Sequence, residues 1–143
     1  MRLIGFNFDK ISIEKLPQKE EQTTDKINIT SNINIDAVNN IKQTIFKTKE
    51  DLLGVKFTYL VDYSPEIAKI EFKGNLVVGV DSKLAKETLK KWEEKQIPED
   101  FKINIYNIIF KKANLKALQL EDEMNLPAHI QLPFIKKPEE SQK

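Results

Sequence analysis

Apolar and polar residues alternate along much of the first half of this chain. Successive side chains of a β-strand point to opposite sides, so such alternation predicts strands with one buried and one solvated face. The clearest stretch is KINITSNINID, whose apolar residues of one parity are Ile27, Ile29, Ile33 and Ile35. Polar residues occupy the positions between them, which predicts a half-buried strand.

Three further segments have the same period. In RLIGFNFDKISIEK the apolar parity changes between Phe8 and Ile11, so a single strand here requires a bulge near Asp9 and Lys10. The segments GVKFTYLVDYSP and IAKIEFKGNLVVGVD follow each other closely, which predicts an antiparallel hairpin. Gly74 has the parity of the buried set, where a glycine indicates a bend or close packing. The four segments together predict a mostly antiparallel sheet with one apolar face.

The period then changes to that of a helix. In DSKLAKETLKKWEEK the apolar stripe consists of Leu84, Ala85, Leu89 and Trp92, as in an amphipathic surface helix. The side chain of Asp81 or Ser82 can accept hydrogen bonds from the first backbone amides. Pro98 opens a second helix over residues 99–120, and the two acidic residues directly after it suit the positive end of that helix.

The second helix is apolar around most of its circumference. One row consists of Phe101, Ile105, Ile108 and Ile109, and a second row of Ile103, Tyr106, Phe110, Ala113 and Ala117. A helix of this kind is buried on more than one side. The second cover is either the first helix or another subunit, and we favour a subunit interface. The predicted fold class is therefore α+β, with a four-stranded antiparallel sheet followed by two helices, in an oligomeric protein.

The stretch LEDEMNLPAHIQLPFIKK follows, in which two prolines prevent the helix from continuing. Its apolar residues alternate as in an extended segment, and they are Leu126, Ile130, Leu132 and Phe134. A disordered tail does not need apolar residues at this spacing. We therefore expect residues 125–135 to form a strap packed against the fold. Residues 1–135 then form a single domain, and residues 136–143 form a flexible tail.

Composition narrows the class of protein. With 143 residues, of which 40% are apolar and 31% charged, the chain suits one folded domain rather than a disordered segment. The net charge is +1, and Arg2 is the only arginine among 23 basic residues, which disfavours nucleic-acid binding. The absence of cysteine fits a reducing cytosol. With no signal-peptide pattern and no apolar stretch of about 18 residues, we expect a cytoplasmic protein without membrane insertion.

Catalysis and cofactor binding have little support in the sequence. His129 is the only histidine, and we interpret it as a packed or surface residue rather than a catalytic one. The acidic run Glu121–Glu123 is interpreted as solvated, because adjacent acids point in different directions and no glycine-organised loop accompanies them. The four glycines are isolated, which disfavours a phosphate-binding loop. We expect no enzymatic activity, no metal and no cofactor.

Aromatic residues on the predicted strands, such as Phe57, Tyr59 and Phe72, are interpreted as core residues rather than an RNA-stacking surface, because no arginine is interleaved with them. Trp92 is likewise interpreted as a helix anchor. What remains is a binding module that holds extended polypeptides in apolar grooves or at a sheet edge. Two alternatives stay open, a small-molecule- or nucleic-acid-binding α+β domain and a structural subunit of a larger complex.

The order of four strands, a short helix and a long apolar helix resembles the export chaperone SecB and its archaeal SecB-like relatives. The likeness covers roughly residues 2–135. The stretch DKISIEKLP is similar to the end of that family's first strand, and the matching residues here are Asp9, Ile11, Ser12, Ile13, Glu14 and Pro17. The stretch NLPAHIQLPFI is similar to the short proline-containing apolar segment that closes the family's core.

This resemblance implies a homo-oligomer, a dimer or a tetramer, with helices sandwiched between sheets. It also implies ATP-independent holding of unfolded or preprotein chains in apolar grooves. The polypeptide-binding residues that it implies here are Phe46 in the crossover segment and Trp92, Tyr106, Leu126, Ile130, Leu132 and Phe134. Bacterial members bind the translocation motor through an acidic sheet surface and a short tail. The tail KKPEESQK is instead mixed in charge, so a general holdase, or a partner-specific chaperone such as those serving toxin–antitoxin pairs, fits as well.

Overall fold

The computed structural model describes residues 1–17, 26–41 and 50–138. Four strands precede two helices, and the elements are β1 (Arg2–Lys15), β2 (Asn28–Ile41), β3 (Asp51–Ser64), β4 (Ala68–Val80), α1 (Ser82–Trp92) and α2 (Glu99–Glu123). This order confirms the predicted α+β fold class. Phe46, one of the predicted binding residues, lies outside the described residues.

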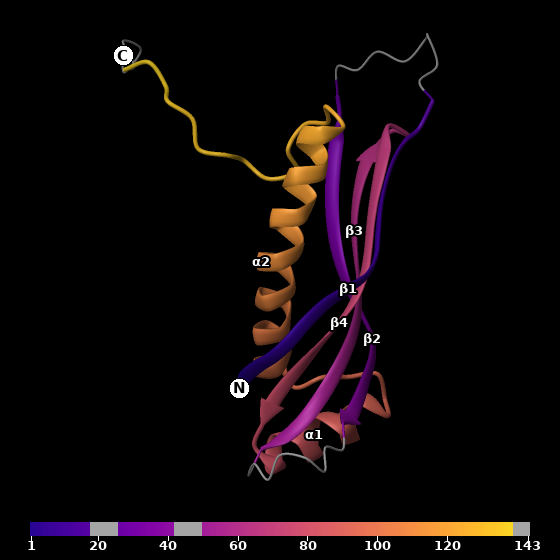
Figure 1. Cartoon of the computed structure of the whole chain (residues 1–143), viewed down its shortest axis with the longest axis vertical. Coiled ribbons are helices and arrows are strands. Elements are labelled where there is room, and N and C mark those ends of the chain that lie inside the picture. Colours follow the sequence, from indigo (N-terminus) through magenta and orange to yellow (C-terminus); the bar gives the residue numbers. More distant parts are fainter. Residues whose placement is uncertain (18–25, 42–49, 139–143) are drawn as a thin grey trace.

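The strands form one antiparallel sheet in the order β1-β4-β3-β2. The predicted hairpin is the central pair β3 and β4, whereas β1 and β2 are the two edges. Helix α2 runs along one face of the sheet, and α1 lies near one end of it, against β2 and β3 (Figure 1). The other face of the sheet carries neither helix (Figure 1).

Three irregularities interrupt the pairing of the edge strands, and the first lies between Leu3 and Gly5 in β1. In the second irregularity of β1 the pairing passes from Phe8 to Lys10, which leaves Asp9 as the predicted bulge. In β2 the pairing likewise skips Asp36, a bulge that the sequence pattern does not indicate. Because a bulge changes the parity of the strand, Ile35 and Val38 both pack inward although they differ in parity.

The core lies between α2 and the two central strands. The alternation in β3 and β4 buries one face, and these side chains are Val55, Phe57, Tyr59, Val61, Tyr63, Ala68, Ile70, Phe72, Leu76, Val78 and Val80. Gly74 belongs to the same face, and a Cβ atom there would collide with the backbone oxygen of Asn7. Close packing of β4 against β1, rather than a bend, therefore explains this glycine.

Helix α2 is covered on one side within the chain. Its buried residues are Phe101, Ile105, Ile109, Ala113, Ala117 and Glu121. The second predicted row is divided, since Ala113 and Ala117 are buried, Tyr106 and Phe110 are half-buried, and Ile103 is 51% exposed. Leu115 is 65% exposed on the same side of the helix as Ile103. A second layer over this face is not provided by the described part of the chain.

The ends of the helices follow from local hydrogen bonds. Asp81 caps α1, since its Oδ1 accepts from the backbone N–H of Leu84 at 2.7 Å, as predicted. Helix α2 extends to Glu123, beyond the predicted end at residue 120. Asn125 ends it with φ 54°, while the N–H of Leu126 donates to the carbonyl of Glu121. This Schellman arrangement, rather than the prolines, reverses the chain at the end of the helix.

Candidate functional site

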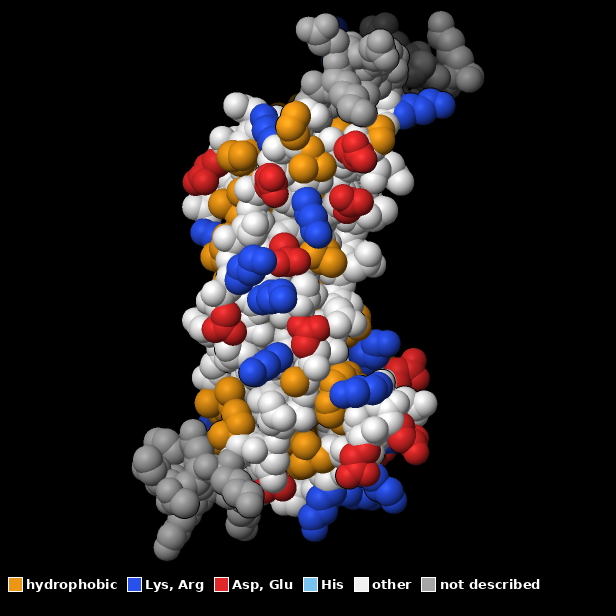
Figure 2. Space-filling model, turned by 90° about the vertical axis from the view of Figure 1, so that its right-hand side faces the viewer, with side chains coloured by type: hydrophobic (Ala, Val, Ile, Leu, Met, Phe, Trp, Pro, Cys, Tyr) orange, Lys and Arg blue, Asp and Glu red, His pale blue; other side chains and the backbone are white. Residues whose placement is uncertain are grey.

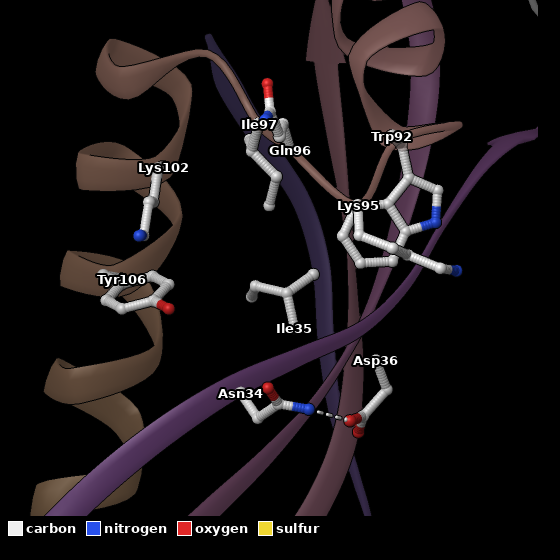
Figure 3. A pocket seen from close by; sticks show the side chains of 9 residues that line it. All are labelled: Asn34, Ile35, Asp36, Trp92, Lys95, Gln96, Ile97, Lys102 and Tyr106. Carbon is white, nitrogen blue, oxygen red and sulfur yellow. Dashed lines mark hydrogen bonds between the residues drawn. The ribbon is translucent and has the colours of Figure 1, made fainter.

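A groove of about 630 Å³ opens between the edge strand β2, the α1–α2 connection and the first turns of α2. Its lining residues are Asn34, Ile35, Asp36, Trp92, Lys95, Gln96, Ile97, Lys102 and Tyr106. Figure 3 shows Trp92 and Tyr106 on opposite sides of this space, with Ile35 and Ile97 between them. Each wall therefore comes from a different element of the fold.

The walls combine aromatic and aliphatic surface with lysine side chains. The Lys95 ammonium lies 4.7 Å from the ring centroid of Trp92, and the Lys102 ammonium lies 5.4 Å from that of Tyr106. Such contacts hold a cation on an aromatic face while the ring edges stay available for apolar groups. The groove therefore suits apolar or aromatic side chains whose own backbone makes polar contacts at the rim.

The floor of the groove is polar where β2 bulges. Asp36 accepts hydrogen bonds from Asn34 Nδ2 at 2.6 Å and from Thr58 Oγ1 at 2.5 Å (Figure 3 shows the first). These bonds fix the bulged residue between its neighbours on β2 and β3. Because the bulge interrupts the regular row of backbone groups on this edge, it opposes the addition of another strand there.

The structure brings together only some of the predicted binding residues. Trp92 and Tyr106 line the same groove, whereas Leu126 packs against the core. The exposed fractions of Ile130, Leu132 and Phe134 are 39%, 51% and 62%, and none of the three lines the groove. The predicted strap is therefore packed only up to His129. From Ile130 onward the segment is not packed in this structure, since it extends away from the body of the fold (Figure 1).

Sequence reasoning missed Ile35, Ile97, Lys95 and Lys102 as lining residues. Ile35 is part of the clearest alternating stretch, so its inward orientation was predictable. Its place in a groove was not, because that depends on β2 being an edge strand beneath the α1–α2 connection.

A buried polar cluster lies at the other end of α2. Glu121, interpreted above as a solvated acid, is 1% exposed, and this interpretation is wrong. His129 Nδ1 lies 2.8 Å from Glu121 Oε2, and both side chains are 1% exposed. The backbone N–H of His129 also donates to Glu121 Oε1 at 3.1 Å. Because a carboxylate only accepts hydrogen bonds, we place a proton on His129 Nδ1.

Two tyrosines of β3 complete this cluster. His129 Nε2 lies 3.0 Å from Tyr59 Oη and 2.9 Å from Asn114 Oδ1, and Tyr59 Oη also donates to Asn114 at 2.8 Å. Tyr63 Oη donates to the carbonyl of Pro127 at 2.5 Å. The segment after the helix is thus fastened to both α2 and the sheet, and of the two interpretations given above for His129, packed or surface, the structure shows the packed one.

The buried tyrosines make stability sensitive to alkaline pH. Burial, and secondarily the Glu121 carboxylate, raise the pKa of Tyr59 and Tyr63 above the ordinary 10.0. Above pH 10 the unfolded chain releases protons that the folded chain keeps, so we expect the free energy of unfolding to fall with a slope that rises toward a limit of about 1.4 kcal/mol per pH unit for each tyrosine. Urea unfolding between pH 8 and 11 should show a shallower decline for Tyr59→Phe. An unchanged slope would contradict this origin.

Neither a metal centre nor a membrane-spanning helix is found among the described residues. They contain no group of three or more histidine, aspartate or glutamate side chains placed to hold a metal ion. In the same ranges no helix is both long and apolar enough to cross a membrane.

The face of the sheet turned away from α2 carries both signs of charge. Figure 2 shows lysine, aspartate and glutamate side chains interspersed over it, and Lys10 pairs with Glu71 at 2.5 Å. The ammonium of Lys10 lowers the pKa of that carboxyl. A continuous acidic surface is therefore absent from the described residues drawn on this face.

No family model matches the sequence, and no curated protein matches it. Among solved structures, the chain is similar to the SecB-like chaperone Rv1957 of Mycobacterium tuberculosis in complex with a ChAD peptide from the Rv1956 HigA1 antitoxin. The TM-score is 0.53 at 9% identity, and the match covers 96% of this chain and 92% of that chain. At this identity the likeness concerns the fold alone. The chain therefore has the SecB-like fold, a four-stranded antiparallel sheet followed by two helices.

Proposed function

We propose that this protein is an ATP-independent chaperone that holds non-native polypeptides in the groove between β2, the α1–α2 connection and α2. The groove itself carries the proposal, since Trp92 and Tyr106 face one space together with Ile35 and Ile97. An unfolded chain offers apolar and aromatic side chains in many sequences, and this mixed surface accepts them without demanding one shape. The solved relative in fold is itself bound to a peptide, which supports a polypeptide as the ligand.

The proposed mode of binding is capture of side chains rather than extension of the sheet. The bulge at Asp36 and its two side-chain hydrogen bonds disfavour a regular fifth strand next to β2. Affinity then comes from apolar area buried against the aromatic walls, on the order of 25 cal/mol per Å² before the cost of ordering the client. Because many sequences can supply such apolar area, we expect the groove to select only weakly among client sequences.

Replacement of the two aromatic residues of the groove should strongly weaken the binding of unfolded clients. We expect Trp92→Ala combined with Tyr106→Ala to weaken binding of an unfolded client about tenfold or more, because aromatic anchors dominate such contacts. The measurement is light scattering of an aggregating client at stoichiometric amounts of chaperone. Trp92→Phe is the matched control, since it keeps an aromatic ring, and urea unfolding checks that each variant is folded. Equal suppression by the double variant would refute the groove as the binding site.

We also propose that the protein is a homo-oligomer in which a second copy covers the outer face of α2. Ile103 and Leu115 lie on one i, i+4 row of this helix and are more than half exposed. Asn107 and Lys111 lie between them on this row, so the proposed interface has an apolar contact at each end and polar contacts in the middle. This proposal keeps the interface separate from the groove, which opens toward β2.

A charged side chain introduced on the outer face of α2 should dissociate the proposed oligomer. For Leu115→Lys we expect a smaller mass by size-exclusion chromatography with light scattering, because a lysine at a dry interface is left without a partner. Lys112→Ala, at an exposed position of the same helix, should leave the mass unchanged. A monomeric mass for the unsubstituted protein at micromolar concentration would exclude the proposed oligomer.

A further inference from the structure

Residues 130–135 leave the fold after His129, on the flank of α2 where Asn114 lies two i, i+4 steps beyond Tyr106 of the groove. His129 contacts Tyr59 Oη at 3.0 Å, and Tyr59 is paired directly with Ile33 of β2. Tyr106, from the groove wall, donates to the carbonyl of that same Ile33 at 3.4 Å. His129 Nε2 also lies 2.9 Å from Asn114 Oδ1, and Asn114 follows the groove residue Tyr106 by eight residues of α2, which is about 12 Å of helix rise.

The segment is long enough to enter the groove. The nine described residues from Ile130 to Pro138 span up to about 30 Å when extended, which exceeds that separation. Their starting point is fixed, because the backbone and the ring of His129 are both bonded to Glu121. A short segment held at one end near a site has a high effective concentration there, on the order of millimolar.

The chemistry of the segment matches that of a client. Ile130, Leu132 and Phe134 alternate along an extended chain, so their side chains share one side, and all three are exposed. Pro133 restricts the backbone to extended conformations and lowers the entropy lost on binding. In the structure Lys136 lies 5.3 Å from the ring centroid of Phe134, the same kind of contact that the groove lysines make with Trp92 and Tyr106.

We propose that residues 130–135 bind the groove of their own chain as an internal competitor, which a client must displace. The inference rests on the proposed function of the groove and adds its regulation. The protein then alternates between the open arrangement described above and a closed one in which the segment covers Trp92. Only clients with enough apolar surface to outcompete the segment are held.

The first experiment needs no client. Trp92 is the only tryptophan of the chain, so its fluorescence reports on the groove alone. We expect Leu132→Ser combined with Phe134→Ser to shift the emission to longer wavelength, because the indole becomes more hydrated. Truncation after Gln131 should give the same shift, and Lys136→Ser combined with Lys137→Ser is the control. Identical spectra for all variants would overturn the inference.

The second experiment measures affinity for an unfolded client that lacks tryptophan. If the segment fills half of the grooves, its removal halves the apparent Kd, so we expect binding at least about twofold tighter when Leu132→Ser and Phe134→Ser are combined. Equal, measurable Kd values for the unsubstituted protein and this variant would overturn the internal competitor while leaving the chaperone function intact. Absence of binding by both proteins would instead refute the proposed function. The Trp92 emission spectra of the first experiment would then still show whether the segment covers the groove, because they need no client.

The third experiment tests that the occupant is the same chain. The protein has no cysteine, so Lys136→Cys provides one attachment point for an energy acceptor. Transfer from Trp92 should fall when client is added and should not change on dilution. Transfer that disappears on dilution would show that the segment binds a second copy, which would overturn the proposal of an intramolecular contact.

Discussion

Replacement of Glu121 by leucine should lower the free energy of unfolding by about 2–6 kcal/mol, because two buried donors lose their acceptor at a typical cost of about 1–3 kcal/mol each. Glu121 accepts from both the ring and the backbone N–H of His129, and in the leucine variant these two donors stay buried without an acceptor. Such a loss is a large part of the roughly 5–15 kcal/mol that stabilises a typical domain. Urea denaturation followed by circular dichroism measures it.

Two further variants identify the cause of that loss. Glu123→Leu removes the same charge from the same acidic run at an exposed position, and we expect a change within about 0.5 kcal/mol. Glu121→Leu combined with His129→Leu should recover much of the stability, because no polar donor of the ring is then left unpaired. If Glu121→Leu and Glu123→Leu were equally mild, Glu121 would be a solvated residue after all.

Truncation after Glu123 should be at least as damaging, with a loss of about 3 kcal/mol or more. It removes Leu126 from the core, the carbonyl that accepts from Tyr63, and His129. Tyr63 and Glu121 then lose their partners, and a new carboxylate appears at the negative end of α2. The urea midpoint and the thermal midpoint should both fall.

The control is truncation after Gln131, which keeps the whole buried cluster and, among the described residues, removes only exposed side chains. We expect its stability to lie within about 0.5 kcal/mol of the full chain. A normal stability of the shorter variant, ending at Glu123, would mean that the segment after the helix adds nothing to the fold. The two truncations thus place the boundary between packed and exposed chain between Glu123 and Gln131.

The elements of the fold were predictable because burial on one face imposes a period on the sequence. Even the bulge at Asp9 follows from the change of parity between Phe8 and Ile11. The bulge at Asp36 was harder to predict, since Val38 alone has the new parity, whereas Ile11 and Ile13 both have it in β1. Periodicity therefore locates strands better than it locates the irregularities that shape the groove.

The site was predictable only in part, because it depends on contacts between residues that are far apart in the sequence. Trp92 and Tyr106 were inferred from the resemblance in element order, and they do share a groove. The pairing of Glu121 with His129 depends on the reversal at Asn125, and a single acid inside an acidic run has no local sign of burial. Strand order is equally non-local, because it is set by pairing between β1 and β4.

That pairing has a consequence during synthesis on the ribosome. Lys15 at the end of β1 pairs with Ala68 at the start of β4, which is 53 residues later (68 minus 15). At roughly 5–20 residues per second, β1 emerges about 3–10 s before its partner strand exists. Throughout that interval the nascent chain presents the phenylalanines of β1 unpaired. During this interval the protein, which we propose binds non-native polypeptides, is thus itself a non-native chain with exposed apolar side chains.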